Sequence, residues 1–299
     1  MSNPFKQVFP RRKPGSTPTN NPPRHPRGAL SIYDPAYLGV DTRGRTVTVP
    51  LMYRNFLLGG EPGSGKSVAL GNIVSHAALC ADVDLVLIDG KLVELLPYAP
   101  IGKQFVGNNI GKALKVLREL QTEMDRRYLH LAQTGAKKIT KKDNFRATLL
   151  AIDELAYFSV TVGTPEQQKE FVTLVRDLVA RGRAAGIIVV AATQRPSADI
   201  VPTSLRDLFS YRLAFRCTTD SSSDIILGTG WAKEGLSAKN ISPEALGVGL
   251  LLAEGGVPRR IKTAYLTDRH VTRLVARAAH IRKVTDNPTD DSTPGGEAA

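Results

Sequence analysis

The stretch Gly60-Glu61-Pro62-Gly63-Ser64-Gly65-Lys66-Ser67 decides the fold class of this chain. It follows a short apolar run, Phe56-Leu57-Leu58, and precedes a segment from Val68 to Cys80 that is typical of a helix. In a glycine-rich loop between a strand and a helix, backbone N–H groups turn inward and bind phosphate. The alternative, a glycine-rich turn before a structural helix, has no need of the Gly-Lys-Ser ending. The stretch therefore predicts a nucleotide phosphate loop, in which Lys66 neutralises β- and γ-phosphate charge and Ser67 ligates Mg²⁺.

A second apolar run ends in two carboxylates. Thr148-Leu149-Leu150-Ala151-Ile152 is typical of a buried parallel strand, and Asp153-Glu154 follow it directly. By themselves, two acids at a strand end fit a solvated turn equally well. Together with the phosphate loop they favour an ATPase site, where Asp153 holds Mg²⁺ through its water shell and Glu154 polarises the attacking water. The predicted cofactors are ATP and Mg²⁺.

Strand and helix patterns alternate along the chain, which predicts an α/β fold with a mainly parallel central sheet. Further strands are expected at Asp84 to Asp89 and at Gly186 to Ala192. Helices are expected at Lys112 to Leu131, from a cap at Thr164, and at Val271 to Lys283. We expect one α/β domain, residues 31–283, between a disordered basic proline-rich arm, residues 1–30, and an acidic flexible tail, residues 284–299.

The chain is basic, with a formal net charge of +12 over 299 residues. The first thirty residues carry six cations and no acid, and the last sixteen carry four acids, so the body between them keeps a charge of +10. A basic body favours a polyanionic partner such as nucleic acid, although a cationic surface that serves only solubility gives the same count. Two cysteines without metal-ligand spacing fit a reduced, cytoplasmic setting, and no apolar run is long enough to span a membrane.

Several motifs, in order, resemble the FtsK/SpoIIIE family of DNA-pumping ATPases. They are Leu38-Gly39-Val40-Asp41, Glu123-Met124-Asp125-Arg126-Arg127-Tyr128, Gly182-Arg183-Ala184-Ala185-Gly186, Ala192-Thr193-Gln194-Arg195-Pro196-Ser197 and Tyr211-Arg212-Leu213-Ala214-Phe215-Arg216. The resemblance covers roughly 38–266 and implies a RecA-like motor that forms a hexameric ring around double-stranded DNA, with ATP at the subunit interfaces.

The resemblance also implies roles for single residues. Gln194 would be the polar sensor between the γ-phosphate and the DNA-facing loops. Arg183 would be an arginine finger that reaches the neighbouring subunit's nucleotide, although Arg181 competes for that role. Arg195 and Arg206 match positions that face the channel and contact the DNA backbone. Lys91 lies in a family motif to which we assign no role at this stage.

The chain differs from chromosome-pumping members of the family, because we expect no membrane helix and no winged helix after the motor. It looks most like the compact transfer proteins of actinobacterial conjugative plasmids and integrative elements. The leading hypothesis is an ATP-driven translocase of double-stranded DNA in conjugative transfer, with membrane or septal accessory proteins as further partners. Alternatives are a chromosome segregation motor, a protein-secretion ATPase of the same superfamily and a nucleotide-switched DNA-binding scaffold. The lysines at 137, 138, 141 and 142 form either a loop that grips the DNA backbone or an exposed turn.

Overall fold

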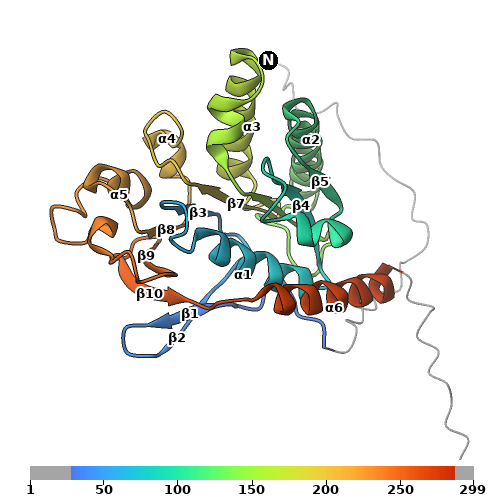
Figure 1. Cartoon of the computed structure of the whole chain (residues 1–299). Coiled ribbons are helices and arrows are strands. Elements are labelled where there is room, and N and C mark those ends of the chain that lie inside the picture. Colours follow the sequence, from blue (N-terminus) through green and yellow to red (C-terminus); the bar gives the residue numbers. More distant parts are fainter. Residues whose placement is uncertain (1–27, 287–299) are drawn as a thin grey trace, which may run out of the picture.

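The computed structural model describes residues 28–286, which form one ten-stranded sheet with helices on both faces (Figure 1). The strands are β1 (Ala36–Asp41), β2 (Thr46–Val49), β3 (Phe56–Gly59), β4 (Val83–Ile88), β5 (Gln104–Val106), β6 (Ala147–Ile152), β7 (Ile187–Thr193), β8 (Tyr211–Phe215), β9 (Val248–Ala253) and β10 (Arg259–Thr263). The α-helices are α1 (Lys66–Leu79), α2 (Ile110–Thr134), α3 (Pro165–Arg181), α4 (Thr203–Arg206), α5 (Asp220–Leu227) and α6 (Asp268–Asp286). Short 3₁₀ turns span Leu96–Ile101 and Ala238–Asn240, and a π turn spans Tyr157–Thr161.

The strand order is β2-β1-β10-β9-β8-β3-β7-β6-β4-β5. The six strands from β8 to β5 run parallel, whereas β9, β10, β1 and β2 extend the sheet in antiparallel pairs. The predicted α/β fold with a mainly parallel sheet is therefore confirmed. The two parallel strands that carry the predicted site, β3 and β6, are not neighbours, because β7 lies between them.

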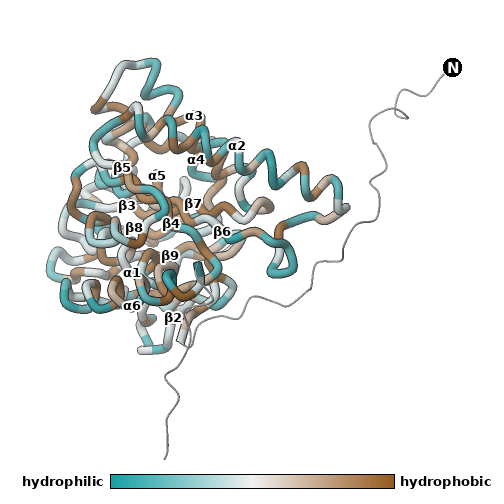
Figure 2. Tube along the Cα trace, turned by 90° about the vertical axis from the view of Figure 1, so that its right-hand side faces the viewer, coloured by the Kyte–Doolittle hydropathy of each residue, from teal (hydrophilic) through white to brown (hydrophobic). Residues whose placement is uncertain are grey.

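Side chains of the central strands alternate between two apolar layers, as the period of two in a strand requires. Leu57, Leu150 and Val189 belong to the layer under α2 and α3, whereas Leu58 and Leu149 belong to the layer over α1 and α6. Strands buried on both faces read as continuous apolar runs, which explains the sequence pattern. Figure 2 shows these strands in brown, while α2 mixes teal and brown because only one of its faces is buried.

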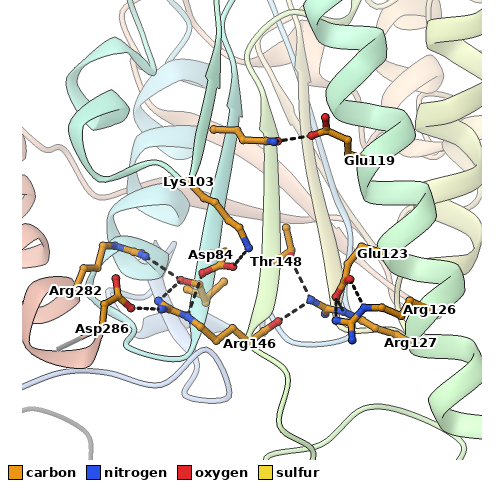
Figure 3. Close-up of polar contacts among 12 residues, drawn as sticks. Asp84, Lys103, Glu119, Glu123, Arg126, Arg127, Arg146, Thr148, Arg282 and Asp286 are labelled. Carbon is orange, nitrogen blue, oxygen red and sulfur yellow. Dashed lines mark hydrogen bonds and ion pairs between the residues drawn. The ribbon is translucent and has the colours of Figure 1, made fainter. Parts of the chain in front are cut away.

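The predicted helices are present, with small shifts at their ends. Thr164 caps α3 through a reciprocal capping box with Gln167, as the sequence indicated. Helix α6 runs to Asp286, three residues into the segment expected to be a flexible tail, and Arg146 holds this end through ion pairs with Asp286 (2.7 Å) and Asp84 (3.0 Å) (Figure 3). The rest of the predicted arm and tail, residues 1–27 and 287–299, lies outside the described residues. None of the helices between residues 28 and 286 combines the length and apolarity needed to cross a bilayer.

Candidate nucleotide site

The phosphate loop leaves β3 and leads into α1, as predicted. Gly63 (φ 75°) and Gly65 (φ 111°) adopt backbone conformations that side-chain-bearing residues rarely take. A Cβ on Gly65 would also lie 2.6 Å from Cα of Gly247, so the loop packs directly against the start of β9. Ser64 closes the turn by donating from Oγ to the carbonyl of Glu61 (2.7 Å). The loop is thus a tight turn that leads directly into the N-terminus of α1, a position where phosphate is favoured.

Strand pairing brings the predicted acids to this loop. Residue Ile152 of β6 lies opposite Ile88 of β4 and Ala191 of β7, and Thr193 of β7 lies opposite Gly59 of β3. The carboxyl ends of four adjacent parallel strands therefore meet at one edge of the sheet. We call this edge the catalytic edge, because the phosphate loop, Asp153, Glu154 and Gln194 all follow these strands.

Lys66 and Asp153 face each other at the centre of the catalytic edge. Their side chains are 2% and 0% exposed, and Nζ of Lys66 lies 3.8 Å from Oδ1 of Asp153. Within residues 28–286, neither Nζ of Lys66 nor either carboxylate oxygen of Asp153 has a hydrogen-bond partner. Buried polar groups are normally paired, so these atoms fit a site that phosphate oxygens and Mg²⁺ complete. Ser67, one residue beyond Lys66 on α1, is the remaining predicted Mg²⁺ ligand.

Burial dominates the protonation of Asp153. Burial, helped by the charges of Asp89 and Glu94 and opposed by those of Lys66 and Lys91, raises the pKa of this carboxyl to about 6. A cation added at this position would favour the ionised carboxylate, which is the form that an Mg²⁺ shell requires.

Glu154 is held by backbone donors. The N–H of Gln194 donates to both carboxylate oxygens (3.2 and 3.0 Å), and the N–H of Ala156 donates to Oε1 (3.3 Å). Lys91 adds an ion pair, with Nζ 3.6 Å from Oε2. Gln194 thus contacts Glu154 through its backbone N–H. Lys91 had no role assigned from the sequence, although it follows the apolar strand β4, which pairs with β6. The signal for its place at the catalytic edge is therefore its position just after a buried parallel strand.

Arg183 lies far from its own chain's phosphate loop. It precedes β7, at the amino-terminal edge of the sheet, where Nε donates to the carbonyl of Tyr53 (3.0 Å) and Nη2 contacts Glu254 (3.3 Å). Its turn is anchored by α2, since Arg127 donates to the carbonyl of Ala185 (2.9 Å). The competitor Arg181 is occupied by ion pairs with acids on α2 and α3.

The two predicted DNA contacts differ in exposure. Arg195 directly follows Gln194 at the catalytic edge, and 67% of its side chain is exposed. Arg206 has only 9% of its side chain exposed, and its guanidinium donates to Asp207 (2.8 Å) and to the carbonyl of Asp224 (3.4 Å). The structure therefore presents Arg195 at the surface and keeps Arg206 inside, so a contact from Arg206 to DNA would require this side chain to leave its position.

The lysine segment is anchored at its centre. Ile139 is buried and donates its N–H to the carbonyl of Ala184 (2.8 Å). Nζ of Lys138 lies 4.3 Å from the centre of the Tyr53 ring, and Nζ of Lys141 lies 4.8 Å from that of Tyr33. The segment is a fixed cationic surface beside Arg183.

Comparison with known proteins agrees with this geometry. Residues 35–151 match the FtsK/SpoIIIE family model. The chain is 30% identical over 293 residues to the DNA translocase FtsK of Staphylococcus aureus strain Mu50, covering 88% of this chain and 35% of that protein. It is 31% identical over 282 residues to FtsK of Corynebacterium glutamicum, covering 85% and 29%. The chain thus spans about a third of the length of these relatives.

Two solved structures have the same fold. The pCW3 conjugation coupling protein TcpA gives a TM-score of 0.70 at 23% identity, covering 87% of this chain and 75% of that one. The cytoplasmic domain of the type VII secretion ATPase EccC from Thermomonospora curvata gives 0.63 at 20% identity, covering 83% and 31%. At these identities the likeness concerns the fold alone. The phosphate loop and the paired acids at the catalytic edge, joined to the family match over residues 35–151 and to the relatives in sequence, mark this chain as an ATPase similar to those of the FtsK/SpoIIIE family.

Proposed function

We propose that this chain is an ATP-driven translocase of double-stranded DNA. One observation carries the proposal: the residue that contacts the catalytic carboxylate is adjacent in sequence to the exposed cation. The N–H of Gln194 holds Glu154, and Arg195 is 67% exposed at the next position. A movement of the Arg195 backbone on contact with a phosphate backbone would act on Gln194 directly, because one planar peptide joins the two residues. DNA contact and hydrolysis are therefore coupled over one residue.

The proposed chemistry follows from the position of each side chain. Lys66, at the N-terminus of α1, would neutralise charge on the β- and γ-phosphates, and Ser67 and Asp153 would hold Mg²⁺, which neutralises further phosphate charge when bound. Mg²⁺ is usually held by one or two carboxylates together with substrate phosphates and water, so the phosphates would complete its shell here. Glu154, held by two backbone N–H groups, orients and polarises the attacking water.

Assembly is part of the proposal. Arg183 lines a hollow of about 370 Å³ together with Arg54, Lys137 and Lys138, at the edge opposite the chain's own phosphate loop. Four cations around one hollow suit the polyphosphate of a neighbouring copy, and a guanidinium delivered there would stabilise charge in phosphoryl transfer. We propose that copies of the chain form a ring, hexameric as the family resemblance implies, and that hydrolysis requires it.

We propose conjugative transfer of plasmid or mobile-element DNA as the biological task, and segregation of chromosomal DNA as the second possibility within the same activity. The likeness in fold to TcpA, a conjugation coupling protein, supports the first. The motor would act in the cytoplasm, where ATP is available, and partner proteins would recruit it to the membrane or septum.

The test is the ATPase rate of the full chain against added duplex DNA across a salt series, with Lys66→Ala as the inactive variant. We expect DNA to stimulate turnover, the stimulation to weaken as salt rises, and turnover to vanish in Lys66→Ala. Stimulation by a secretion substrate but not by DNA would instead make the chain a protein-export ATPase. Ring formation and DNA binding without hydrolysis would make it a scaffold. Displacement of a triplex-forming strand separates translocation from binding.

A further inference from the structure

We propose that Lys91 is a positioning residue for Glu154, and this inference rests on the proposed ATP hydrolysis. The two side chains come from neighbouring strands, since Lys91 follows β4 and Glu154 follows β6. The register pairs Ile88 with Ile152, so the segments after the two strands run side by side. Nζ of Lys91 lies 3.6 Å from Oε2 of Glu154.

The backbone around Lys91 is fixed by a buried carboxylate. Asp89 is fully buried, and its two oxygens accept four N–H groups of the following turn. Oδ1 accepts from Lys91 (3.1 Å) and Leu92 (2.9 Å), and Oδ2 accepts from Val93 (3.0 Å) and Leu95 (2.8 Å). Four such bonds leave the turn little freedom, so the Lys91 side chain starts from a defined point beside Glu154.

Gly90 presses this turn against the segment that carries Glu154. A Cβ on Gly90 would lie 2.4 Å from Cδ1 of Tyr157, which is three residues beyond Glu154. A larger residue at position 90 would require the Tyr157 ring or one of the two segments to move. The turn and the catalytic segment therefore pack closely, which holds the backbone that carries Lys91 next to the backbone that carries Glu154.

Lys91 is a charged neighbour of a carboxylate that is almost fully buried. The Glu154 side chain is 7% exposed, and Asp153, also an acid, is the preceding residue. Oε1 accepts from the N–H groups of Gln194 and Ala156, whereas Oε2 has one backbone donor, the N–H of Gln194, and the ammonium of Lys91 as its second partner. Without this cation Oε2 keeps a single donor, so the carboxylate has more freedom to turn, and the water that it orients moves with it.

The test is a double-mutant cycle on turnover, using Lys91→Met, Glu154→Gln and the pair in the full chain, with DNA absent and present. We expect Lys91→Met to lower kcat by about tenfold to a hundredfold with the KM for ATP within about twofold of wild type, as a misplaced catalytic group does. In the Glu154→Gln background the same change should lower kcat by less than about twofold, because Lys91 acts through Glu154. Lys91→Arg keeps the charge and should restore most of the rate. Lys103→Met is the matched control, since this exposed lysine pairs with Asp84 at the opposite edge of the sheet.

Two further measurements do not use turnover. Urea unfolding of the nucleotide-free variants should show that the single changes are not additive, whereas Lys103→Met and Glu154→Gln should add. Fluorescent ATP should bind Lys91→Met as tightly as wild type. Undiminished kcat in Lys91→Met overturns the inference. So does a tenfold loss of ATP affinity that persists in the Glu154→Gln background, which would make Lys91 a phosphate contact. If DNA fails to stimulate wild-type turnover, the proposed translocation fails, while the cycle on basal turnover still decides the role of Lys91.

Discussion

Replacing Arg127 by Met tests whether α2 anchors the turn that carries Arg183. The Arg127 side chain is 5% exposed, and its guanidinium donates to four groups. Nη1 donates to the carbonyl of Ala185 (2.9 Å). Nη2 donates to the carbonyl of Arg146 (2.9 Å) and to Oγ1 of Thr148 (3.5 Å), and Nε donates to Glu123 (2.7 Å) (Figure 3). Met keeps the buried hydrocarbon stem and leaves the two carbonyls without their donor.

The expected loss can be worked from these contacts. An acceptor left unsatisfied in the interior costs about 1–3 kcal/mol, and two are left here. Met also removes the cost of burying a charged guanidinium, and this offsets part of the loss. The free energy of unfolding should therefore decrease by about 2–4 kcal/mol.

The neighbouring arginine provides a matched control. Arg126 pairs with the same Glu123 at 2.7 Å, but 60% of its side chain is exposed. Exposed pairs contribute about 0–1 kcal/mol, so Arg126→Met should change the unfolding free energy by no more than that. Urea unfolding of both variants measures the difference. Equal destabilisation within about 0.5 kcal/mol would refute the reasoning, because only Arg127 is buried and donates to the carbonyls of Ala185 and Arg146.

Three further predictions concern the catalytic edge. Glu154→Gln should bind ATP but lower turnover by a factor on the order of 10²–10⁴, since the amide cannot accept a proton from water. A nucleotide-retention assay measures this, and rapid release of ADP would contradict the prediction. Asp153→Asn should stabilise the nucleotide-free chain: because the pKa of Asp153 is raised to about 6 from 3.8, the ionised form opposes folding above that pH. The free energy of unfolding should rise by on the order of 2–3 kcal/mol at pH 7.5, and this increase should shrink as the pH falls from 6 towards 4. If urea unfolding shows no increase at pH 7.5, burial of the ionised Asp153 does not destabilise the chain. Arg195→Gln should weaken binding of duplex DNA and reduce the slope of log K against log salt by about 1, as measured by fluorescence anisotropy. Arg118 is an exposed arginine paired with Glu170, and Arg118→Gln should leave this slope unchanged.

Most of the local structure could be predicted from the sequence because its signals are short in range. The phosphate loop needs glycines at fixed positions and a strand and helix on either side, and all of these lie within about 25 residues. The cap at Thr164 depends on Gln167, which is one turn away. The apolar runs at 147–152 and 187–193 reflect burial on both faces of the sheet.

Exposure of single charged residues could not be predicted in the same way. Arg195 and Arg206 match the family pattern equally well, yet one is exposed and the other is held by Asp207 and by the carbonyl of Asp224. The difference depends on how the segment after β7 folds back on α5. That packing involves residues far apart in the chain, for which the sequence contains no periodic signal.

The sequence by itself determined the chemistry of this protein: a phosphate loop, a pair of acids at a strand end and a basic body. Only the tertiary structure decided how these parts meet. Strand order places β7 between β3 and β6, which brings Gln194 against Glu154 and sets Arg195 beside them, and the pairing of β4 with β6 brings Lys91 to the same carboxylate. The physical reason is that a motif depends on the backbone conformation of its own few residues, whereas the strand order depends on how the whole sheet buries its two apolar layers.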